Sequence, residues 1–579
     1  MQKEIAMSNT KNEGAAEPVC LFSEEHVRLI KEQYKDWFNK SLREEDRQTE
    51  GKYFTHSGIP VKLAYTPADI EHINYIEDIG FPGHAPYLRG VYPNMYRGKL
   101  FTVRQLAGLG APEDCNERVC YLLDHGATGV NILFDLPTIR GYNSDDPEAE
   151  GNVGQCGAAV DSMNDVDAYF KGIDLGTVST SIVTHLPSTS LVIPGMYFAV
   201  AQQRNTPLNK VAGTCQNDFI METCVGSGYE ILPPSVSFRM QCDVVEWVCK
   251  NVPRFNPISY NGYNLREAGT DAVAEVGIAI SNAIATAEEL IRRGMDFDTF
   301  APRMSFFWDL HNDFFEEIAK CRASRKVWYK IAKERFGAKN PKSMLMRYHV
   351  QTAGVTLPAT EPLNNIARSA IQGLAAVLGG CQSLHIDSFD EAYSAPTEEA
   401  ALVSLRTQQI IQTETGVCST VDPLAGSYYV EYLTDQMTQR IFDYIKKIDG
   451  LGGLVQAVES GWLHREIANY NNKYQTKIEN GEMKIVGVNY MRADKAESAP
   501  IKVFEYPETY SRQKAKLERL RKDRDHNKVE QSLKTLREKC HTTENLYPYC
   551  LDAVKSMVTL GEIEELFREE FGLWSFPLL

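Results

Sequence analysis

Several features that mark other protein classes are missing from this sequence of 579 residues. No apolar run approaches the roughly 18 residues that a membrane-spanning helix needs, and the best candidate, residues 191–201, contains Pro194 and Gly195. The first residues have neither the basic flank nor the apolar core of a secretory signal. The thirteen cysteines form no Cys-x-x-Cys pair, which argues against a disulfide framework and against a zinc ribbon. We therefore expect a soluble, cytoplasmic protein with reduced thiols.

Acidic residues outnumber basic residues in this chain. The chain has 61 Lys and Arg residues against 77 Asp and Glu residues, a formal net charge of -16, whereas nucleic-acid binding relies on clustered cations. One basic stretch, residues 511–528, carries Leu, Glu and Asp at helical spacing and lacks the aromatic residues of a base-stacking surface. We expect no nucleic-acid partner and no membrane partner, and we interpret this stretch as a solvated helix or a subunit-docking helix.

The chain divides by composition into three regions. Residues 1–80 form an N-terminal extension, a polar tail followed by a helix near residues 24–37. Residues 81–430 alternate short apolar runs, such as 126–138 and 300–308, with helix-length segments such as 271–293 and 313–334. Residues 431–579 show mainly helical periodicity. Strand-then-helix alternation over this length predicts an α/β fold, a (β/α)8 TIM barrel with an N-terminal extension and a helical C-terminal region.

One predicted strand is unusual for such a barrel. It carries Thr177, Ser179 and Ser181 on one side, whereas barrel interiors are normally filled by Val, Ile and Leu. Small hydroxyl side chains at alternate positions favour a hollow interior that accommodates something polar. Ordinary tolerance of Ser and Thr in a strand explains the pattern equally well.

More specific signals lie in short strings spread through the barrel region. Their residues are 92–108, 134–147, 212–218, 262–269, 301–308, 351–354, 382–392 and 422–431. In this order and spacing they resemble the adenosylcobalamin-dependent acyl-CoA mutases, with the methylmalonyl-CoA and isobutyryl-CoA mutases as the nearest groups. The resemblance implies an isomerase that binds adenosylcobalamin and threads acyl-CoA through the barrel. The implied reaction is a radical 1,2-shift of the thioester carbonyl group.

The family's cobalamin-binding domain has no counterpart that we identify in this sequence. That domain carries Asp-x-His-x-x-Gly, and the nearest string, residues 309–314, has Phe314 in place of the Gly. We interpret His311 as a local barrel or cap residue and predict no metal ligand in this chain. The resemblance to the isobutyryl type then implies that the cobalt is held mainly by a separate small subunit. We expect a hetero-oligomer in which residues 431–579 dock that subunit.

The resemblance also assigns site residues. Gln216, near the substrate carbonyl, and Asn264 match catalytic positions. Substrate and CoA positions are matched by Tyr92, Met95, Lys99, Thr102, Arg104, Leu106, Asn131, Thr214, Gly226, Arg303 and Ser305. Cofactor positions are matched by Phe134, Glu267, Gln351, Gly354 and Glu391.

The positions that set the substrate depart from the family pattern. Where the methylmalonyl enzyme holds a free carboxylate with Arg and Tyr, this chain has Gly226 and Leu106. A buried carboxylate without a counter-charge costs several kcal/mol, so a dicarboxylic acyl-CoA is disfavoured. The isobutyryl type is expected to have Gln and Phe there, so Gly and Leu enlarge the pocket and make it less polar. This favours a branched, uncharged acyl group of the pivalyl/isovaleryl kind, and Leu133 offers no carboxylate for a 2-hydroxyisobutyryl group.

Other departures keep alternatives open. The family's His that donates to the thioester carbonyl is Asn264 here, and Ile139 replaces a His beside the cofactor. Loss of a donor at developing negative charge typically costs about 10²–10³-fold in rate. Lys99 stands where the family has an Arg, so a compact ammonium group replaces a planar guanidinium that could bind bidentately. An isobutyryl-CoA, 2-hydroxyisobutyryl-CoA or methylmalonyl-CoA type of mutase, or a non-catalytic barrel partner, remains the alternative.

Overall fold

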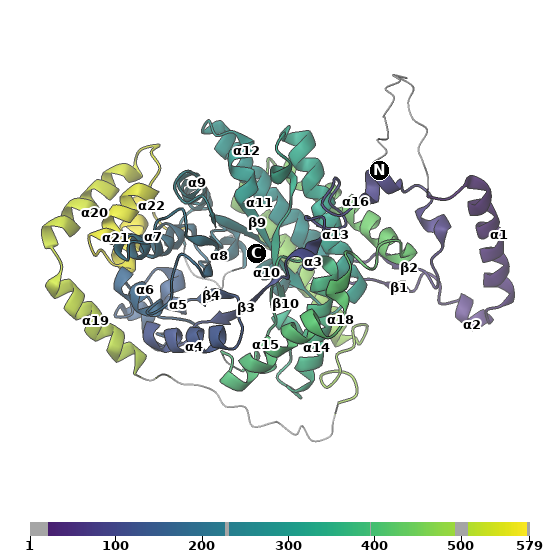
Figure 1. The fold of residues 1–579 in the computed structure, drawn as a ribbon, viewed down its shortest axis with the longest axis horizontal. Coiled ribbons are helices and arrows are strands. Elements are labelled where there is room, and N and C mark those ends of the chain that lie inside the picture. The colour runs from purple at the N-terminus through teal and green to yellow at the C-terminus, as the bar shows by residue number, and fades with distance from the viewer. Residues whose placement is uncertain (1–20, 226–230, 394, 493–505, 507, 576–579) are drawn as a thin grey trace, which may run out of the picture.

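The computed structural model describes residues 21–225, 231–393, 395–492, 506 and 508–575. Its centre is a parallel sheet that curls into a barrel ringed by helices (Figure 1). A separate two-stranded hairpin pairs β1 (Tyr53–Phe54) with β2 (Pro60–Val61). No helix in the described part of the chain is long and apolar enough to cross a membrane, and the twelve cysteines described are free thiols.

All strands of the barrel run parallel and pair in the order β7-β6-β5-β4-β3-β11-β10-β9-β8. Pro257 separates β7 from β8 and lacks the N–H that a ladder needs. β7 pairs with β6 and β8 pairs with β9, so these two pieces act as one strand and close the ring. The predicted (β/α)8 TIM barrel is confirmed. Its strands are β3 (Thr102–Ala107), β4 (Gly129–Leu133), β5 (Ser179–Val183), β6 (Ala212–Cys215), β7 (Phe255–Asn256), β8 (Ile258–Asn261), β9 (Met304–Leu310), β10 (Tyr348–Thr352) and β11 (Ser383–His385).

A helix follows each strand and covers the outside of the barrel. The hydrophobic core lies between these two layers, where outward-facing side chains such as Val130, Ile182, Trp308 and Val350 are buried. Asp271 caps the longest of these helices by accepting hydrogen bonds from the backbone N–H groups of Val273 and Ala274. The barrel helices are α4 (Pro112–Asp124), α5 (Leu136–Arg140), α6 (Met163–Tyr169), α7 (Pro187–Gln203), α8 (Ile220–Val225), α9 (Pro234–Asn251), α10 (Tyr263–Glu267), α11 (Ala272–Arg292), α12 (Phe297–Phe300), α13 (Phe314–Lys330), α14 (Asn364–Gly379) and α15 (Glu398–Thr413).

The regions before and after the barrel are mainly helical. The N-terminal extension contains α1 (Glu24–Lys40) and α2 (Glu44–Arg47), and α3 (Met95–Gly98) precedes the first barrel strand. Helix α16 packs on α11 and α13, α17 packs on α11, and α18 packs on α17 and α8. Helices α19 to α22 lie on another flank beside α6 and α7 (Figure 1). These C-terminal helices are α16 (Tyr428–Gly450), α17 (Leu454–Glu459), α18 (Trp462–Glu479), α19 (Thr509–Asp523), α20 (His526–Cys540), α21 (Tyr547–Lys555) and α22 (Leu560–Phe571).

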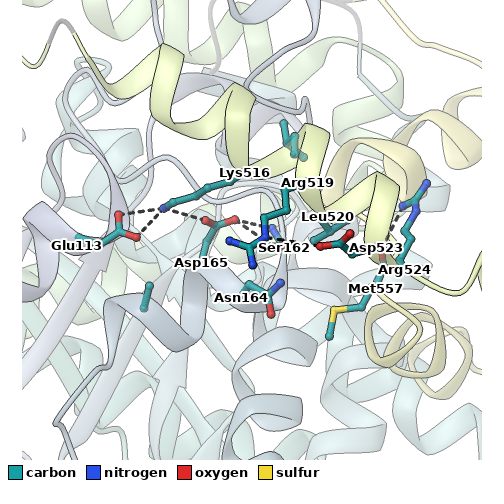
Figure 2. A pocket seen from close by; sticks show the side chains of 12 residues that line it. Glu113, Ser162, Asn164, Asp165, Lys516, Arg519, Leu520, Asp523, Arg524 and Met557 are labelled. Carbon is teal, nitrogen blue, oxygen red and sulfur yellow. Dashed lines mark hydrogen bonds and ion pairs between the residues drawn. The ribbon is translucent and has the colours of Figure 1, made fainter.

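The basic stretch at residues 511–528 is bound within the chain. Lys516 on α19 reaches between Glu113 of α4 and Asp165 of α6, at 2.7 and 3.4 Å (Figure 2). Arg512 pairs with Asp114 at 2.9 Å in the same contact. The sequence interpretation of a solvated or subunit-docking helix was incomplete, because the acidic partners lie about 400 residues away in sequence and become neighbours only in the folded barrel.

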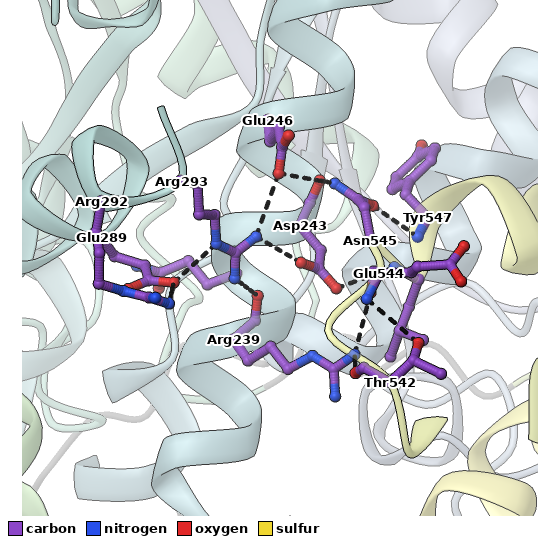
Figure 3. Close-up of polar contacts among 12 residues, drawn as sticks. Arg239, Asp243, Glu246, Glu289, Arg292, Arg293, Thr542, Glu544, Asn545 and Tyr547 are labelled. Atoms are coloured by element: carbon purple, nitrogen blue, oxygen red, sulfur yellow. Dashed lines mark hydrogen bonds and ion pairs between the residues drawn. The ribbon is translucent and has the colours of Figure 1, made fainter. Parts of the chain in front are cut away.

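A second contact fixes the connection between α20 and α21 (Figure 3). The guanidinium of Arg239, on α9, donates hydrogen bonds to the backbone carbonyls of Cys540, Thr542 and Glu544. Next to it, the Asp243 carboxylate accepts from the backbone N–H of Leu546 at 3.0 Å. The C-terminal helices are therefore held on the barrel by hydrogen bonds to charged groups.

We expect Arg239→Met to loosen this attachment, because three carbonyls lose a charged donor while the apolar part of the side chain is kept. A hydrogen bond to a charged group contributes about 1.5–3 kcal/mol, so amide exchange in α21 should become about ten- to a hundredfold faster. Hydrogen–deuterium exchange measures this change. Lys514→Met, at an exposed residue of α19 outside this contact, is the control, and equal exchange in both variants would contradict the assignment.

Candidate active site

The barrel interior is hollow. A cavity of about 220 Å³ runs along it, and Ser179 and Ser181 of β5 line it, as the pattern of that strand predicts. Further small polar side chains complete the wall, namely Thr102, Thr214, Asn256, Ser259, Ser305 and Ser383. The volume lies below the 300–1,000 Å³ that is common for ligand pockets, so the bore suits an extended chain better than a ring system.

The mouth of the bore at the N-terminal ends of the strands is cationic. Arg254 and Arg347 line it, each directly before a strand, and Tyr92 lies there with 41% of its surface exposed. Burial, together with the neighbouring Arg347 and Arg254, lowers the pKa of Arg303. Among the described residues no carboxylate lies within ion-pair distance of these three arginines, and Arg303 Nη2 and Arg347 Nε are buried without a hydrogen-bond partner. Such an arrangement suits a phosphate.

A further arginine lies inside the bore. Arg104 of β3 donates to the Val130 carbonyl at 3.1 Å and to Ser179 Oγ at 2.8 Å. Burial lowers its pKa to about 10, because no anionic partner offsets the cost of desolvation. On the neighbouring strand, Asn131 Oδ1 is also buried without a partner. These groups can bind the amides and carbonyls of a polar chain.

The inner end of the bore is formed by Gln216, Phe307 and His349. Gln216 follows β6 and is buried, and its Oε1 has no hydrogen-bond partner in the described structure. The Phe307 ring stacks on Tyr263 at 5.0 Å and packs on His349 at 5.1 Å. Gln351 Nε2 donates to the Tyr263 hydroxyl at 2.9 Å. A layer of rings thus lies between the bore and the C-terminal ends of the strands.

Buried carboxyl groups crowd the C-terminal ends of the strands. The pKa values of Glu267, Asp387 and Glu391 are each raised to about 8, mainly by burial, and for the two glutamates the neighbouring Asp387 contributes to this rise. Burial also raises the pKa of Asp309 well above its usual value. Neither carboxyl oxygen of Asp309 has a hydrogen-bond partner among the described residues. At neutral pH Glu267, Asp387 and Glu391 therefore favour the protonated form, in which a carboxyl group can donate a hydrogen bond as well as accept one.

Gly354 lies close to the buried carboxyl groups of this face. Glu267 Oε1 is buried without a partner. A Cβ added to Gly354 would lie 3.2 Å from Glu267 Oε2, 3.3 Å from the Tyr263 hydroxyl and 3.8 Å from Glu391 Cγ. A side chain at residue 354 would therefore crowd Glu267 and Tyr263, whereas glycine does not. The two glutamates have the chemistry to hydrogen-bond the hydroxyl groups of a nucleoside.

Beneath this face, a buried ion cluster holds α10 in place. Arg266 pairs with Glu317 at 3.1 Å, and Lys320 pairs with Glu275 at 2.7 Å and with Glu317 at 2.5 Å. All four side chains are at most 4% exposed. Arg266 directly precedes Glu267, so this cluster sets the position of the Glu267 carboxyl.

The other sequence-assigned residues occupy several places. Asn264 lies on α10, where its Oδ1 accepts from Asn261 Nδ2 at 3.1 Å, and it does not line the bore. Met95 is buried against Gly90, and Lys99 is exposed, so neither lines the bore. Leu106, Leu133 and Phe134 lie at the C-terminal ends of β3 and β4, and Ile139 is buried on α5. Gly226 lies outside the described residues.

The sequence reasoning missed several residues of the site. Arg254, Arg347, Tyr263, Phe307 and Asp387 were not singled out. A usable signal exists for the two arginines, because a cation that immediately precedes a parallel strand lies at the bottom of a barrel. Phe307 follows Ser305 by two residues in the same strand, so strand alternation places both side chains on the inner face.

Comparison with known proteins agrees with this geometry. The sequence profile of the family described as methylmalonyl-CoA mutase matches residues 54–573. The chain is 39% identical over 554 residues to the 2-hydroxyisobutanoyl-CoA mutase large subunit of Aquincola tertiaricarbonis, covering 94% of this chain and 96% of that protein. It is 38% identical to the probable mitochondrial methylmalonyl-CoA mutase of Caenorhabditis elegans (90% and 69% covered) and 37% identical to the methylmalonyl-CoA mutase of Escherichia coli (93% and 75% covered).

The arginine mouth generates a binding prediction. We expect Arg347→Met to weaken the binding of coenzyme A about ten- to a hundredfold, because charge-assisted hydrogen bonds contribute about 1.5–3 kcal/mol. Isothermal titration calorimetry at fixed salt measures the dissociation constant. Arg406→Met, an exposed arginine on α15, should bind as the parent protein does, and an unchanged constant for Arg347→Met would place the phosphates elsewhere.

Proposed function

The chain belongs to the methylmalonyl-CoA mutase family, and we propose that it is the catalytic large subunit of an adenosylcobalamin-dependent acyl-CoA mutase. The proposed reaction is a 1,2-shift of the thioester carbonyl group in a branched, uncharged acyl-CoA of the pivalyl/isovaleryl kind. The observation that carries the proposal is the polar bore, which leads from an arginine-lined mouth to a carboxyl-lined face at the ends of the barrel strands.

In the proposed complex the substrate lies along the bore. Its phosphates bind at Arg254, Arg303 and Arg347, where buried donors lack partners. The amides of its arm meet the hydroxyls of Ser179 and Ser181 and the guanidinium of Arg104. The thioester reaches Gln216, whose amide Nε2 can donate to the carbonyl oxygen. Binding energy from the distant phosphates thus positions the reacting end.

The cofactor face binds and orients the nucleoside part of the cofactor. Bound there, adenosylcobalamin supplies the radical that removes hydrogen from the acyl group. Glu267 and Glu391 would hydrogen-bond the ribose hydroxyls, and Gly354 adds no side chain that would crowd Glu267. The stacked rings of Tyr263 and Phe307 exclude water from the reacting atoms.

Residues near the reacting end support an uncharged acyl group. Leu106 on β3 pairs with Asn131 on β4. This pair lies two residues closer to the C-terminal ends of the strands than Arg104, which pairs with Gly129 at the level of Ser179. The Arg104 guanidinium donates a hydrogen bond to Ser179 near the N-terminal end of the strands. It therefore does not pair with a substrate carboxylate beside Leu106. The identities of 39% to a 2-hydroxyisobutanoyl-CoA mutase and 36–38% to methylmalonyl-CoA mutases are too similar to select a substrate.

A separate small subunit completes the proposed enzyme. The relative from Aquincola tertiaricarbonis is itself named a large subunit. Within residues 431–579, α18 borders the cofactor face, because the Tyr474 hydroxyl lies 3.4 Å from His311 Nε2. Helices α19 to α22 instead bind the outer barrel helices. We therefore place the docking surface at α18 rather than along the whole C-terminal region.

Reconstitution tests the proposed function. The purified chain alone should show negligible isomerase activity, and a cobalamin-binding small subunit with adenosylcobalamin should restore it. A panel of pivalyl-, isobutyryl-, 2-hydroxyisobutyryl- and methylmalonyl-CoA, followed by chromatography of the products, identifies the substrate. Tight stoichiometric binding of adenosylcobalamin by the isolated chain would contradict the division into subunits. Turnover of no substrate would favour a non-catalytic barrel, for which the occupied side chain of Asn264 is the supporting observation.

The pocket size generates a second test. We expect Leu106→Phe to lower kcat/KM for pivalyl-CoA relative to isobutyryl-CoA about ten- to a hundredfold, since overpacking costs about 1–3 kcal/mol. Leu100→Phe, at a residue that is 43% exposed just before β3, is the matched control. Unchanged discrimination, or efficient turnover of methylmalonyl-CoA by the parent protein, would count against the pocket assignment.

A further inference from the structure

A cluster of metal-ligand residues lies where the N-terminal hairpin meets the start of α13. It consists of His56, in the turn after β1, and of Asp313 and Glu316, at the first turn of α13. One ring nitrogen of His56 and one carboxylate oxygen from each acid lie within 4.8 Å of one another. These residues come from segments about 260 residues apart in sequence, so the tertiary fold creates the cluster.

Several buried polar atoms at this cluster lack hydrogen-bond partners in the described structure. Glu316 is fully buried, and its Oε2 makes no hydrogen bond of good geometry among the described residues, although the Thr55 hydroxyl lies near this carboxyl group. His56 Nδ1 and the hydroxyl of the adjacent Ser57 likewise have no hydrogen-bond partner there. A buried polar atom without a partner costs free energy, so several such atoms at one place indicate a missing ligand.

The remaining carboxylate oxygens are held by the backbone. Asp313 accepts a hydrogen bond from the His56 N–H at 3.0 Å through Oδ2, and Glu316 accepts from the Ser57 N–H at 3.0 Å through Oε1. Each carboxylate is thereby oriented and keeps its second oxygen available. Metal ligands are commonly oriented by hydrogen bonds of this kind.

The charge balance also favours a cation. In the described structure no Lys or Arg lies within 4.0 Å of the Asp313 or Glu316 carboxylate. The nearest ionisable groups that act on His56 from other elements are Arg266, Glu317 and Lys477, and the His311 ring packs edge-on at 5.2 Å. A divalent ion would offset two carboxylate charges without moving a basic side chain into the site.

We propose that His56, Asp313 and Glu316 bind one divalent transition-metal ion of the Zn²⁺ class. Imidazole nitrogen with two carboxylate oxygens suits Zn²⁺ better than Mg²⁺, which prefers an all-oxygen, largely hydrated shell. The Ser57 hydroxyl or a water molecule supplies the fourth ligand. A cleft of about 350 Å³, lined in part by Thr55 and Asp313, gives the ion access.

Such an ion joins the N-terminal hairpin to the cofactor side of the barrel. Helix α13 begins just after β9, and Glu317 on its first turn pairs with Arg266, the neighbour of Glu267. The ion thus fastens residues 53–61 to the helix that supports the cofactor face. This role is structural and does not depend on the proposed reaction.

Metal titration of the full chain tests the site. The chain is dialysed against a chelator and titrated with Zn²⁺, with Mg²⁺ for comparison, by calorimetry and thermal unfolding. We expect one equivalent of Zn²⁺ to bind and to raise the melting temperature. Titration with Co²⁺ should give ligand-field bands without thiolate charge transfer, which separates this site from the cysteines.

Two substitutions test whether Zn²⁺ binds at this cluster rather than elsewhere. His56→Ala and Glu316→Gln should each weaken Zn²⁺ binding at least about tenfold, and His56→Ala removes a partly exposed residue, so it is expected to fold. His541→Ala, which removes a surface histidine paired with Glu570, is the matched control and should bind as the parent does. The proposal is overturned if the parent binds no stoichiometric Zn²⁺, or if the His56→Ala protein binds it with unchanged affinity.

Discussion

The hollow barrel interior is the constraint on which the rest of this structure depends. At inward-facing positions where barrels usually carry branched apolar side chains, this chain places Ser179, Ser181, Ser259 and Ser305. The interior therefore contributes little hydrophobic stabilisation, and the core lies in the layer between strands and helices, where Val130, Ile182 and Trp308 are buried. The bore is available for a ligand because the outer layer alone holds the barrel together.

The two ends of the bore differ in charge. Arginines without acidic partners surround the N-terminal mouth, and protonated carboxyl groups crowd the C-terminal face. Both arrangements cost free energy in the free protein, because buried charges and crowded acids are poorly solvated. The raised pKa values of Glu267, Asp387 and Glu391 mean that the folded state binds protons more tightly than the unfolded chain. Their contribution to stability therefore falls as the pH rises from about 4, the unfolded value, through about 8.

Much of this architecture was predictable from the sequence, for identifiable reasons. Alternating apolar runs and amphipathic segments predicted the barrel. The period-2 hydroxyls of one strand were compatible with a hollow interior but equally with an ordinary strand, and the structure decides for the hollow interior. Residues outside local patterns were harder. The partners of α19, such as Glu113 and Asp165, lie far away in sequence, so their ion pairs could not be anticipated. Met95 and Lys99 match family positions in the sequence. In the structure Met95 packs against Gly90 and Lys99 is exposed to solvent, so neither lines the bore.

The central claim, that acyl-CoA occupies the bore, can be tested directly with a thiol placed inside it. In the Ser181→Cys protein, the rate of alkylation by iodoacetamide is measured by mass spectrometry with and without butyryl-CoA, and the exposed native Cys156 serves as the internal reference. At a concentration of ligand about ten times its dissociation constant, we expect alkylation of the introduced thiol to slow about tenfold while Cys156 reacts as before. An unchanged rate at saturating butyryl-CoA would show that the ligand binds outside the barrel.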